Sequence, residues 1–162
     1  MILGSRICAL IDGMTINTGS YEVDVKNNHG QQDALDKFIA ECDARSVQKF
    51  PLVFYVTNKI TDLRDRKQCR TSIVIMTNTN PDWLSKSRTA ETFEKVIQPI
   101  YDKLIPILEK HFLIVDNELD YLDKDNYGII EGGLASKTSK QSIITDYIDA
   151  RIINLTLQFD EC

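Results

Sequence analysis

The hydrophobic pattern is most regular between Arg88 and Phe112, and this segment predicts the main helix of the domain. Apolar side chains recur there at steps of three and four residues, which places them on one face of an α-helix. They are Phe93, Val96, Ile97, Ile100, Tyr101, Leu104, Ile105 and Leu108. Mostly charged side chains fill the opposite face, so we expect the helix to pack one side against the core. Pro99 and Pro106 predict a bend or a break, because proline lacks the backbone donor.

Other stretches have the patterns of β-strands. Residues 21–25 and 153–159 alternate apolar and polar side chains, as half-buried strands do. Residues 50–56 form a continuous apolar run that is typical of an inner strand, and residues 71–77 are rich in β-branched side chains. Residues 113–115 predict a further short strand.

The remaining segments complete the expected fold. Residues 31–47 predict a second helix whose inner side carries Leu35, Phe38, Ile39 and Cys42, and residues 27–30 (Asn-Asn-His-Gly) predict a turn. Residues 2–11 are apolar and short, so their period fits either a strand or a helix. The order of elements predicts a single α+β domain over residues 1–162, with an antiparallel or mixed β-sheet packed by two or more helices and with extended loops.

Two polar stretches stand apart from the expected core. Asn58–Cys69 contains a run of charged residues, which is typical of a solvated loop; the alternative is a hairpin arm that reaches a neighbouring subunit. Asp116–Asp146 is longer than an ordinary connection, and irregular segments of that length usually bind or assemble something. We therefore treat 58–69 and 116–146 as possible assembly elements.

Composition and charge exclude several classes of protein. The chain has 162 residues, enough for one domain with a sizeable core. No apolar run approaches the roughly 18 residues of a membrane span, and the start lacks the pattern of a secretory signal peptide. The net charge of −5 argues against a free nucleic-acid binder, which usually shows a basic face.

Candidate catalytic and metal-binding motifs are weak. The four cysteines are widely spaced and accompany only two histidines, so we expect no zinc site. The glycines between Gly128 and Gly133 lack the spacing of a phosphate loop. The acidic residues between Asp116 and Asp125 lack the residue order of a calcium loop. Neither His29 nor His111 has an obvious Ser or Cys partner. We therefore expect no catalytic, cofactor-binding or metal-binding residues.

The later two-thirds of the chain resembles a known family. The motifs that carry the resemblance occur in a fixed order along residues 50–159. They are Phe50-Pro51-Leu52-Val53, a strand, the segment from Thr77 to Trp83, Arg88-x₄-Phe93-x₃-Ile97-Gln98-Pro99-Ile100-Tyr101-x₂-Leu104, Asp123-Lys124-Asp125-Asn126-Tyr127-Gly128, and Asp146-Tyr147-Ile148-Asp149-Ala150-Arg151-Ile152 with the alternating terminal strand. Together they resemble the neck and tail-completion proteins of tailed bacteriophages, of the tail-terminator or head–tail connector type.

The resemblance implies a structural virion protein without catalytic activity. Such a subunit forms a homo-oligomeric ring at the junction of head and tail or at the end of the tail, and it is assembled in the host cytoplasm. Its partners would be further copies of itself and the neighbouring portal, connector or tail proteins. DNA would only pass through the lumen, and no membrane would be involved.

A set of charged and aromatic residues forms our hypothesis for the subunit interface. Arginines suit such contacts because the guanidinium group pairs with carboxylates in a forked geometry, and aromatic residues often form the centre of a contact. The candidates are Arg64, Arg66, Lys67, Trp83, Arg88, Asp120, Asp123, Asp125 and Tyr127.

Two other functions stay open at this point. The pair Asp24 and Lys26 fits a small metal-dependent nuclease, in which acids hold Mg²⁺ and a lysine stabilises developing charge. The long stretch Asp116–Asp146 fits an adaptor module that binds a partner protein.

The absence of ligand motifs predicts that no divalent metal or nucleotide binds tightly. Adding Mg²⁺, Zn²⁺ or ATP should leave the melting temperature unchanged, because only a ligand that binds the native state raises it. Differential scanning fluorimetry measures this directly. A rise of several degrees with any one of these ligands would contradict the prediction.

Overall fold

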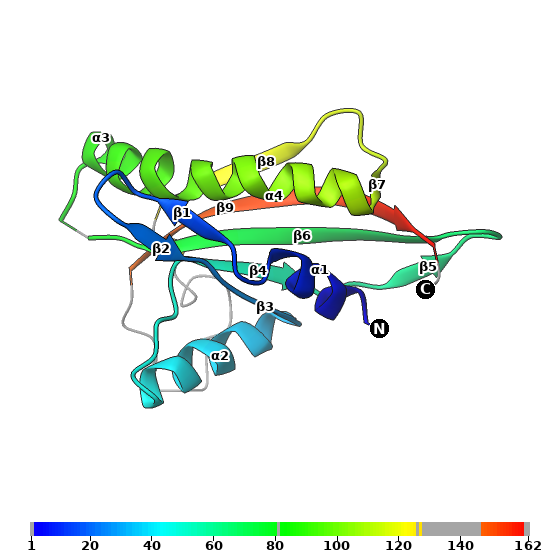
Figure 1. Cartoon of the computed structure of the whole chain (residues 1–162), viewed down its shortest axis with the longest axis horizontal. Coiled ribbons are helices and arrows are strands. Elements are labelled where there is room, and N and C mark those ends of the chain that lie inside the picture. The colour runs from blue at the N-terminus through cyan, green and yellow to red at the C-terminus, as the bar shows by residue number, and fades with distance from the viewer. Residues whose placement is uncertain (1, 81, 126, 128–146, 161–162) are drawn as a thin grey trace.

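Two long strands pair along their whole length at the centre of the fold. β6 (Lys67–Asn78) and β9 (Ile148–Phe159) form an antiparallel ladder in which Lys67 lies opposite Phe159 and Asn78 lies opposite Ile148. This computed structural model describes residues 2–80, 82–125, 127 and 147–160. Figure 1 shows the ladder in the middle of the molecule, with helices on its two sides. The sequence prediction of an α+β fold with a mixed sheet is therefore confirmed.

Shorter strands extend the sheet on both sides of the ladder. β4 (Leu52–Val56) pairs antiparallel with β6, and β3 (Lys26–Gly30) pairs parallel with β4. On the other side, β7 (Leu113–Ile114) and β8 (Asp120–Lys124) both pair with β9. The first residues of β6 pair with β5 (Ile60–Asp62). A separate hairpin joins β1 (Thr15–Asn17) to β2 (Glu22–Asp24).

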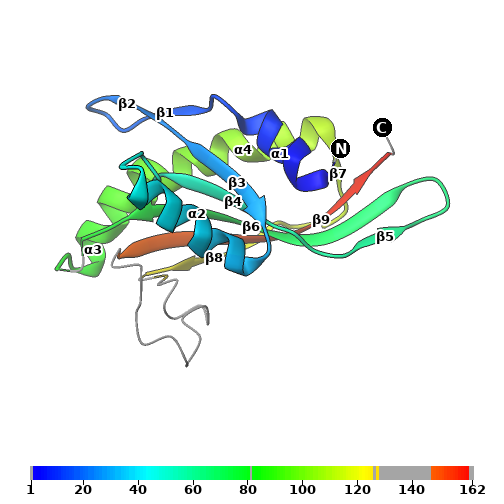
Figure 2. The same cartoon turned by 90° about the horizontal axis from the view of Figure 1, so that it is seen from below.

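A long helical segment and the N-terminal helix cover one face of the sheet, as Figures 1 and 2 show. The segment consists of α3 (Ser85–Arg88), the π-helix η1 (Thr89–Ile97) and α4 (Gln98–His111), and the N-terminal helix is α1 (Leu3–Ile11). The apolar stripe predicted from the sequence faces the sheet: Phe93, Ile97, Ile100, Leu104, Ile105 and Leu108 are buried in the larger core cluster. Val96 and Tyr101 pack against that cluster. The prediction of a packing helix is confirmed.

Of the bend or break predicted at the prolines, a break does not occur. The helical elements follow one another without a gap from Ser85 to His111. The turn before Pro99 is a π-helix, and the amide of Gln98 donates to the carbonyl of Phe93, five residues earlier. A wider turn gives the proline ring the room that an α-turn would deny it. Pro106 lies inside α4, which continues past it.

Helix α2 (Gln32–Ala44) packs on the opposite face of the sheet. Leu35 and Ile39 of this helix are buried against Leu52, Phe54 and Val74 in a second core cluster. Toward the other end of this face the paired side chains are polar. The hydroxyl of Ser72 donates to Asn154 Oδ1 at 2.7 Å, and the side-chain amide of Gln158 donates to Gln68 Oε1 at 2.9 Å.

Several local expectations are corrected by strand pairing. Residues 27–30, which read as a turn, form most of β3 because the parallel ladder with β4 holds them extended. Residues 2–11 fit either a strand or a helix by their sequence, and in the structure Leu3–Ile11 form the helix α1. Asn58–Cys69 folds into a hairpin, and its residues 58–66 are exposed to solvent, as predicted for a charged run. The stretch 116–146, expected to be irregular, contains β8; its residues 126 and 128–146, with the glycines of 128–133, lie outside the described part.

No helix among the described residues is both long enough and apolar enough to cross a bilayer.

The buried stripe predicts a strong asymmetry between the two faces of α4. Leu104 is fully buried, whereas Lys110 of the same helix is exposed. Changing Leu104 to Ala should lower the free energy of unfolding by about 2–5 kcal/mol, since a cavity is left in the core. Changing Lys110 to Ala should alter it by less than about 0.5 kcal/mol. Urea unfolding measures both, and equal losses would mean that the packing face has been assigned wrongly.

Candidate functional site

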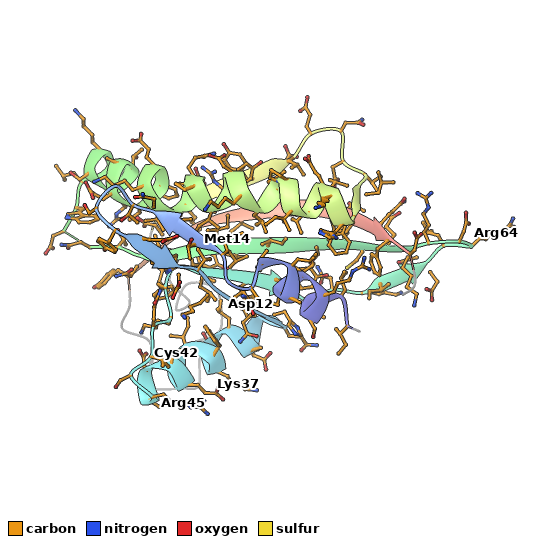
Figure 3. All side chains as sticks on the ribbon, in the orientation of Figure 1. Asp12, Met14, Lys37, Cys42, Arg45 and Arg64 are labelled. Carbon is orange, nitrogen blue, oxygen red and sulfur yellow. The ribbon has the colours of Figure 1, made fainter. Side chains whose placement is uncertain are left out.

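The hairpin formed by β5 and the start of β6 projects from the end of the sheet, and we call residues 58–69 the arm (Figures 1 and 3). The amide of Leu63 donates to the carbonyl of Arg66 at 2.8 Å and closes the tip. Figure 3 shows Arg64 at the outermost end of the arm, pointing away from the domain. Ile60, Leu63, Arg64 and Arg66 are all exposed. The arm therefore presents apolar side chains and more basic than acidic ones, the exposed acidic residues being Asp62 and Asp65.

Lys67 differs from the two arginines of the arm. Its side chain is half-buried, and its Nζ lies 3.7 Å from Asp62 Oδ1 across the hairpin. This pair ties the two strands of the arm together. Arg64 and Arg66 are thus the better candidates for contacts outside the chain.

The strand β8 presents the opposite charge at another edge of the sheet. It pairs with β9 on one side, and no strand of the described residues pairs with its other side. Asp120 and Asp125 are exposed, and so are Tyr121 and Leu122, the latter 59% exposed. We call residues 120–125 the acidic edge. Because the outer amides and carbonyls of an edge strand lack strand partners, such an edge can accept another strand.

One buried arginine fixes the acidic edge to the domain. Arg151 of β9 donates to both carboxylate oxygens of Asp123, at 2.7 and 2.9 Å, and to Gln98 Oε1 at 2.6 Å. Its guanidinium carbon lies 4.0 Å from the ring centre of Tyr121 and 5.1 Å from that of Tyr101 on α4. Burial lowers the pKa of Arg151, but its hydrogen bond to Asp123 and the charge of that carboxylate more than compensate, so the group stays charged.

The contacts of Arg151 were not predicted from the sequence. The only sequence signal for them is a basic residue between two apolar ones, Ala150 and Ile152, in the terminal strand. Asp123, predicted as an interface residue, already has a partner in its own chain, so its carboxylate first of all holds β8 in place.

Arg88 does not face a neighbour, and its assignment to the interface is corrected. It is only 6% exposed, and its Nε lies 3.8 Å from Asp149 Oδ2. One of its terminal nitrogens donates to the carbonyl of Asn80 at 3.3 Å, and Thr92 donates to the same Asp149 oxygen at 2.8 Å. Arg88 therefore anchors the start of the long helical segment to β9.

The two aromatic candidates differ in the same way. Tyr127 is buried in the second core cluster, with Lys124 Nζ 5.7 Å from its ring centre, so it also packs inside the domain. Trp83 is exposed just before α3, next to Leu84, which is 79% exposed. A hollow of about 450 Å³ adjoins Trp83 and is lined further by Lys86, Ser87, Ala90 and Glu91. Only Trp83 remains available for contacts with other proteins.

The structure brings His29 close to a hydroxyl group that sequence reasoning missed. His29 Nε2 and Ser5 Oγ are 3.0 Å apart, across the contact between β3 and α1. A Cβ atom at Gly4 would lie 2.5 Å from His29 Nδ1, so the ring is packed tightly against the backbone of α1. This geometry joins a helix to a strand, and we assign the pair a packing role.

Other reactive groups of the described residues have little support as catalysts. Burial and the charge of Asp12 raise the pKa of Cys8 to about 11, which keeps this thiol protonated and weakly nucleophilic at neutral pH. Asp24 is exposed on β2 and Lys26 is half-buried at the start of β3. Among the residues that the structure describes, no group of three or more His, Cys, Asp or Glu side chains is placed to hold a metal ion. Within the described residues, no group of acids therefore includes Asp24 to hold the metal ion that the nuclease alternative needs.

Neither a protein-family model nor a curated protein sequence matches this chain. A function for the chain accordingly depends on its surfaces and on the sequence motifs. The most distinctive surfaces are the arm and the acidic edge, which lie at different places on the sheet and carry opposite charge.

The buried position of Arg88 predicts that it stabilises the monomer, in contrast to Arg64. Changing Arg88 to Met should lower the free energy of unfolding by about 3–5 kcal/mol, because the change removes a cationic partner of the fully buried Asp149. Changing Arg64 to Met should cost less than about 0.5 kcal/mol. Chemical unfolding of both variants measures this, and equal costs would contradict the assignment of Arg88 to the interior.

Proposed function

We propose that the chain is a structural subunit of the neck or tail terminator of a tailed bacteriophage and that it assembles into a homo-oligomeric ring without catalysing a reaction. The observation that carries this proposal is the pairing of two unlike surfaces on one chain. The arm exposes Arg64 and Arg66, and the acidic edge exposes Asp120 and Asp125.

Unlike surfaces on one chain favour ring closure. A contact between two different patches is heterologous, so each copy uses one patch for the preceding copy and the other patch for the following one. Such contacts close into rings when the rotation between copies allows it. Two identical patches would instead give a closed dimer.

The sequence motifs support the phage assignment and the kind of partner. In a neck or tail terminator the ring would stack on portal, connector or tail proteins, and the exposed Trp83 and Leu84 offer an apolar surface for such a neighbour. The net charge of −5 fits a ring that lets DNA pass, because strong phosphate contacts need basic side chains. The protein would then be found in the virion after assembly in the host cytoplasm.

The proposal is tested by assembly of the purified protein. Size-exclusion chromatography with light scattering, at two concentrations tenfold apart, should show an oligomer or a concentration-dependent rise in mass. Negative-stain electron microscopy of the larger species should show rings. A protein that stays monomeric at both concentrations, and at the concentration reached in infected cells, would contradict the proposal.

The exposed arginines of the arm should be needed for assembly and not for folding. Changing Arg64 and Arg66 together to Ser should leave the melting temperature within about 2 °C and abolish or strongly weaken the oligomer, since rim charges contribute to association. The matched control changes Arg45 and Lys110 to Ser, two exposed basic residues far from the arm in sequence, and should assemble normally. Normal assembly of the arm variant would exclude the arm from the contact.

A further inference from the structure

The arm and the acidic edge are both unpaired edges of the same sheet. β5 continues the position of β4 in the sheet, since both strands pair with β6. The neighbour of β4 is β3, but the chain leaves β3 at Gly30 to begin α2. The position beside β5 is therefore not occupied by any strand of the described residues. β8, at the opposite edge, pairs with β9, and no strand in the described ranges lies on its other side.

The two edges carry opposite charge. The arm carries Lys59, Arg64, Arg66 and Lys67 against Asp62 on β5 itself and Asp65 at the tip, so basic residues outnumber acidic ones and the arm is basic on balance. The acidic edge carries the exposed Asp120 and Asp125 and one basic residue, Lys124, while the charge of Asp123 is matched by Arg151, so this edge is acidic on balance. Two acidic edges brought together would repel each other, and so would two arms, because like charges directly opposite are unfavourable. An arm against an acidic edge is the combination in which opposite charges meet.

Apolar side chains accompany the charges on both edges. Ile60 and Leu63 on the arm and Tyr121 and Leu122 on the acidic edge are large apolar residues that remain exposed in the single chain. Burying them against each other would add a hydrophobic gain to the attraction between charges. Each edge thus offers both charged and apolar side chains to the other, as the two sides of one contact would.

We propose that β8 of one copy pairs with β5 of the next copy, so that the sheet continues across the boundary between subunits. This inference rests on the proposed function, since it names the contact that closes the ring. Strand addition to a free sheet edge is an established way in which protein chains recognise each other, with the backbone supplying the hydrogen bonds.

The directions of the strands fit this contact. β5 runs antiparallel to β6, β6 to β9, and β9 to β8, so β5 and β8 of one sheet run in opposite directions. When copies follow one another around a ring axis with their sheets in the same orientation, the two edges meet as antiparallel strands. Antiparallel pairing is the commoner arrangement between strands.

The positions of the two edges also set the tilt of the strands in the ring. Leu122 lies opposite Ile152 of β9, whereas Thr61 lies level with Gln158, six residues further along β9. Six residues correspond to about 20 Å along a strand. Joining edges with such an offset requires the strands to tilt against the ring axis, as the strands of closed barrels do.

Charge reversal on each edge, alone and together, tests the contact. One variant changes Arg64 and Arg66 to Glu, and the other changes Asp120 and Asp125 to Lys. Each alone should raise the concentration of half-maximal assembly by at least about tenfold, because like charges then face each other. The matched control changes Arg45 and Lys110 to Glu and should assemble like the unaltered protein. Circular dichroism and the melting temperature should show that every variant is folded.

Restoring the opposite charges should restore assembly. An equimolar mixture of the two variants brings acidic arms to basic edges and basic arms to acidic edges, so mixed rings should form. A single chain that carries all four changes should assemble alone. If the unaltered protein assembles but neither combination recovers assembly, the contact between arm and acidic edge is wrong and the proposed ring function stands. If the unaltered protein never assembles, the proposed function itself fails.

Hydrogen exchange separates strand pairing from a contact made by side chains only. Amides of residues 60–62 and 120–124 that point outward should exchange at least about tenfold more slowly in the ring than in the folded monomeric variants. Unchanged exchange in both segments, in a protein whose assembly depends on the charges, would overturn the continuous sheet. Protection confined to other segments would overturn the whole contact.

Discussion

The antiparallel ladder between β6 and β9 is the constraint on which the rest of the structure depends. It has twelve residue pairs, and apolar pairs lie on both of its faces, so the long helical segment and α2 can each bury their apolar sides against it. Every outer strand is positioned by one of these two strands or by β4 beside them. The arm exists because β6 begins before the body of the sheet, and β8 exists because β9 offers a second edge.

Two charged residues on β9 also position the elements that lie beside it. Asp149 and Arg151 are both buried, and a buried charge is costly unless it is paired. Asp149 takes Arg88 and Thr92 as partners, which fixes where the helical segment begins. Arg151 takes Asp123 and Gln98, which fixes β8 beside β9. β9 thus positions the start of the long helical segment through Asp149 and the acidic edge through Arg151, two residues of opposite charge that are two positions apart.

The sequence predicted the elements that are defined by their own periodicity. The apolar stripe of the long helical segment and the strands near residues 50–56, 71–77 and 153–159 needed no partner to be recognised. β3 and β8 could not be recognised in this way, because Asn-Asn-His-Gly and Asp-Tyr-Leu-Asp-Lys become strands only through the ladders that hold them. The same limit applies to single residues: Arg64 and Arg88 look alike in the sequence, and only the fold separates an exposed arginine from one paired with Asp149.

In the proposed ring, the chemistry of the two edges would explain how each copy can carry strands that no strand of the described residues pairs with. An exposed edge with apolar side chains is normally an aggregation hazard, because any other edge can pair with it. The charges disfavour pairing between like edges: Asp120 and Asp125 would repel another acidic edge, and Arg64 and Arg66 would repel another arm. Backbone pairing and apolar burial would then supply the stabilisation, while the charges determine the partner. A contact selected in this way joins unlike edges, so copies that each carry one of either kind join head to tail and all point the same way around the ring.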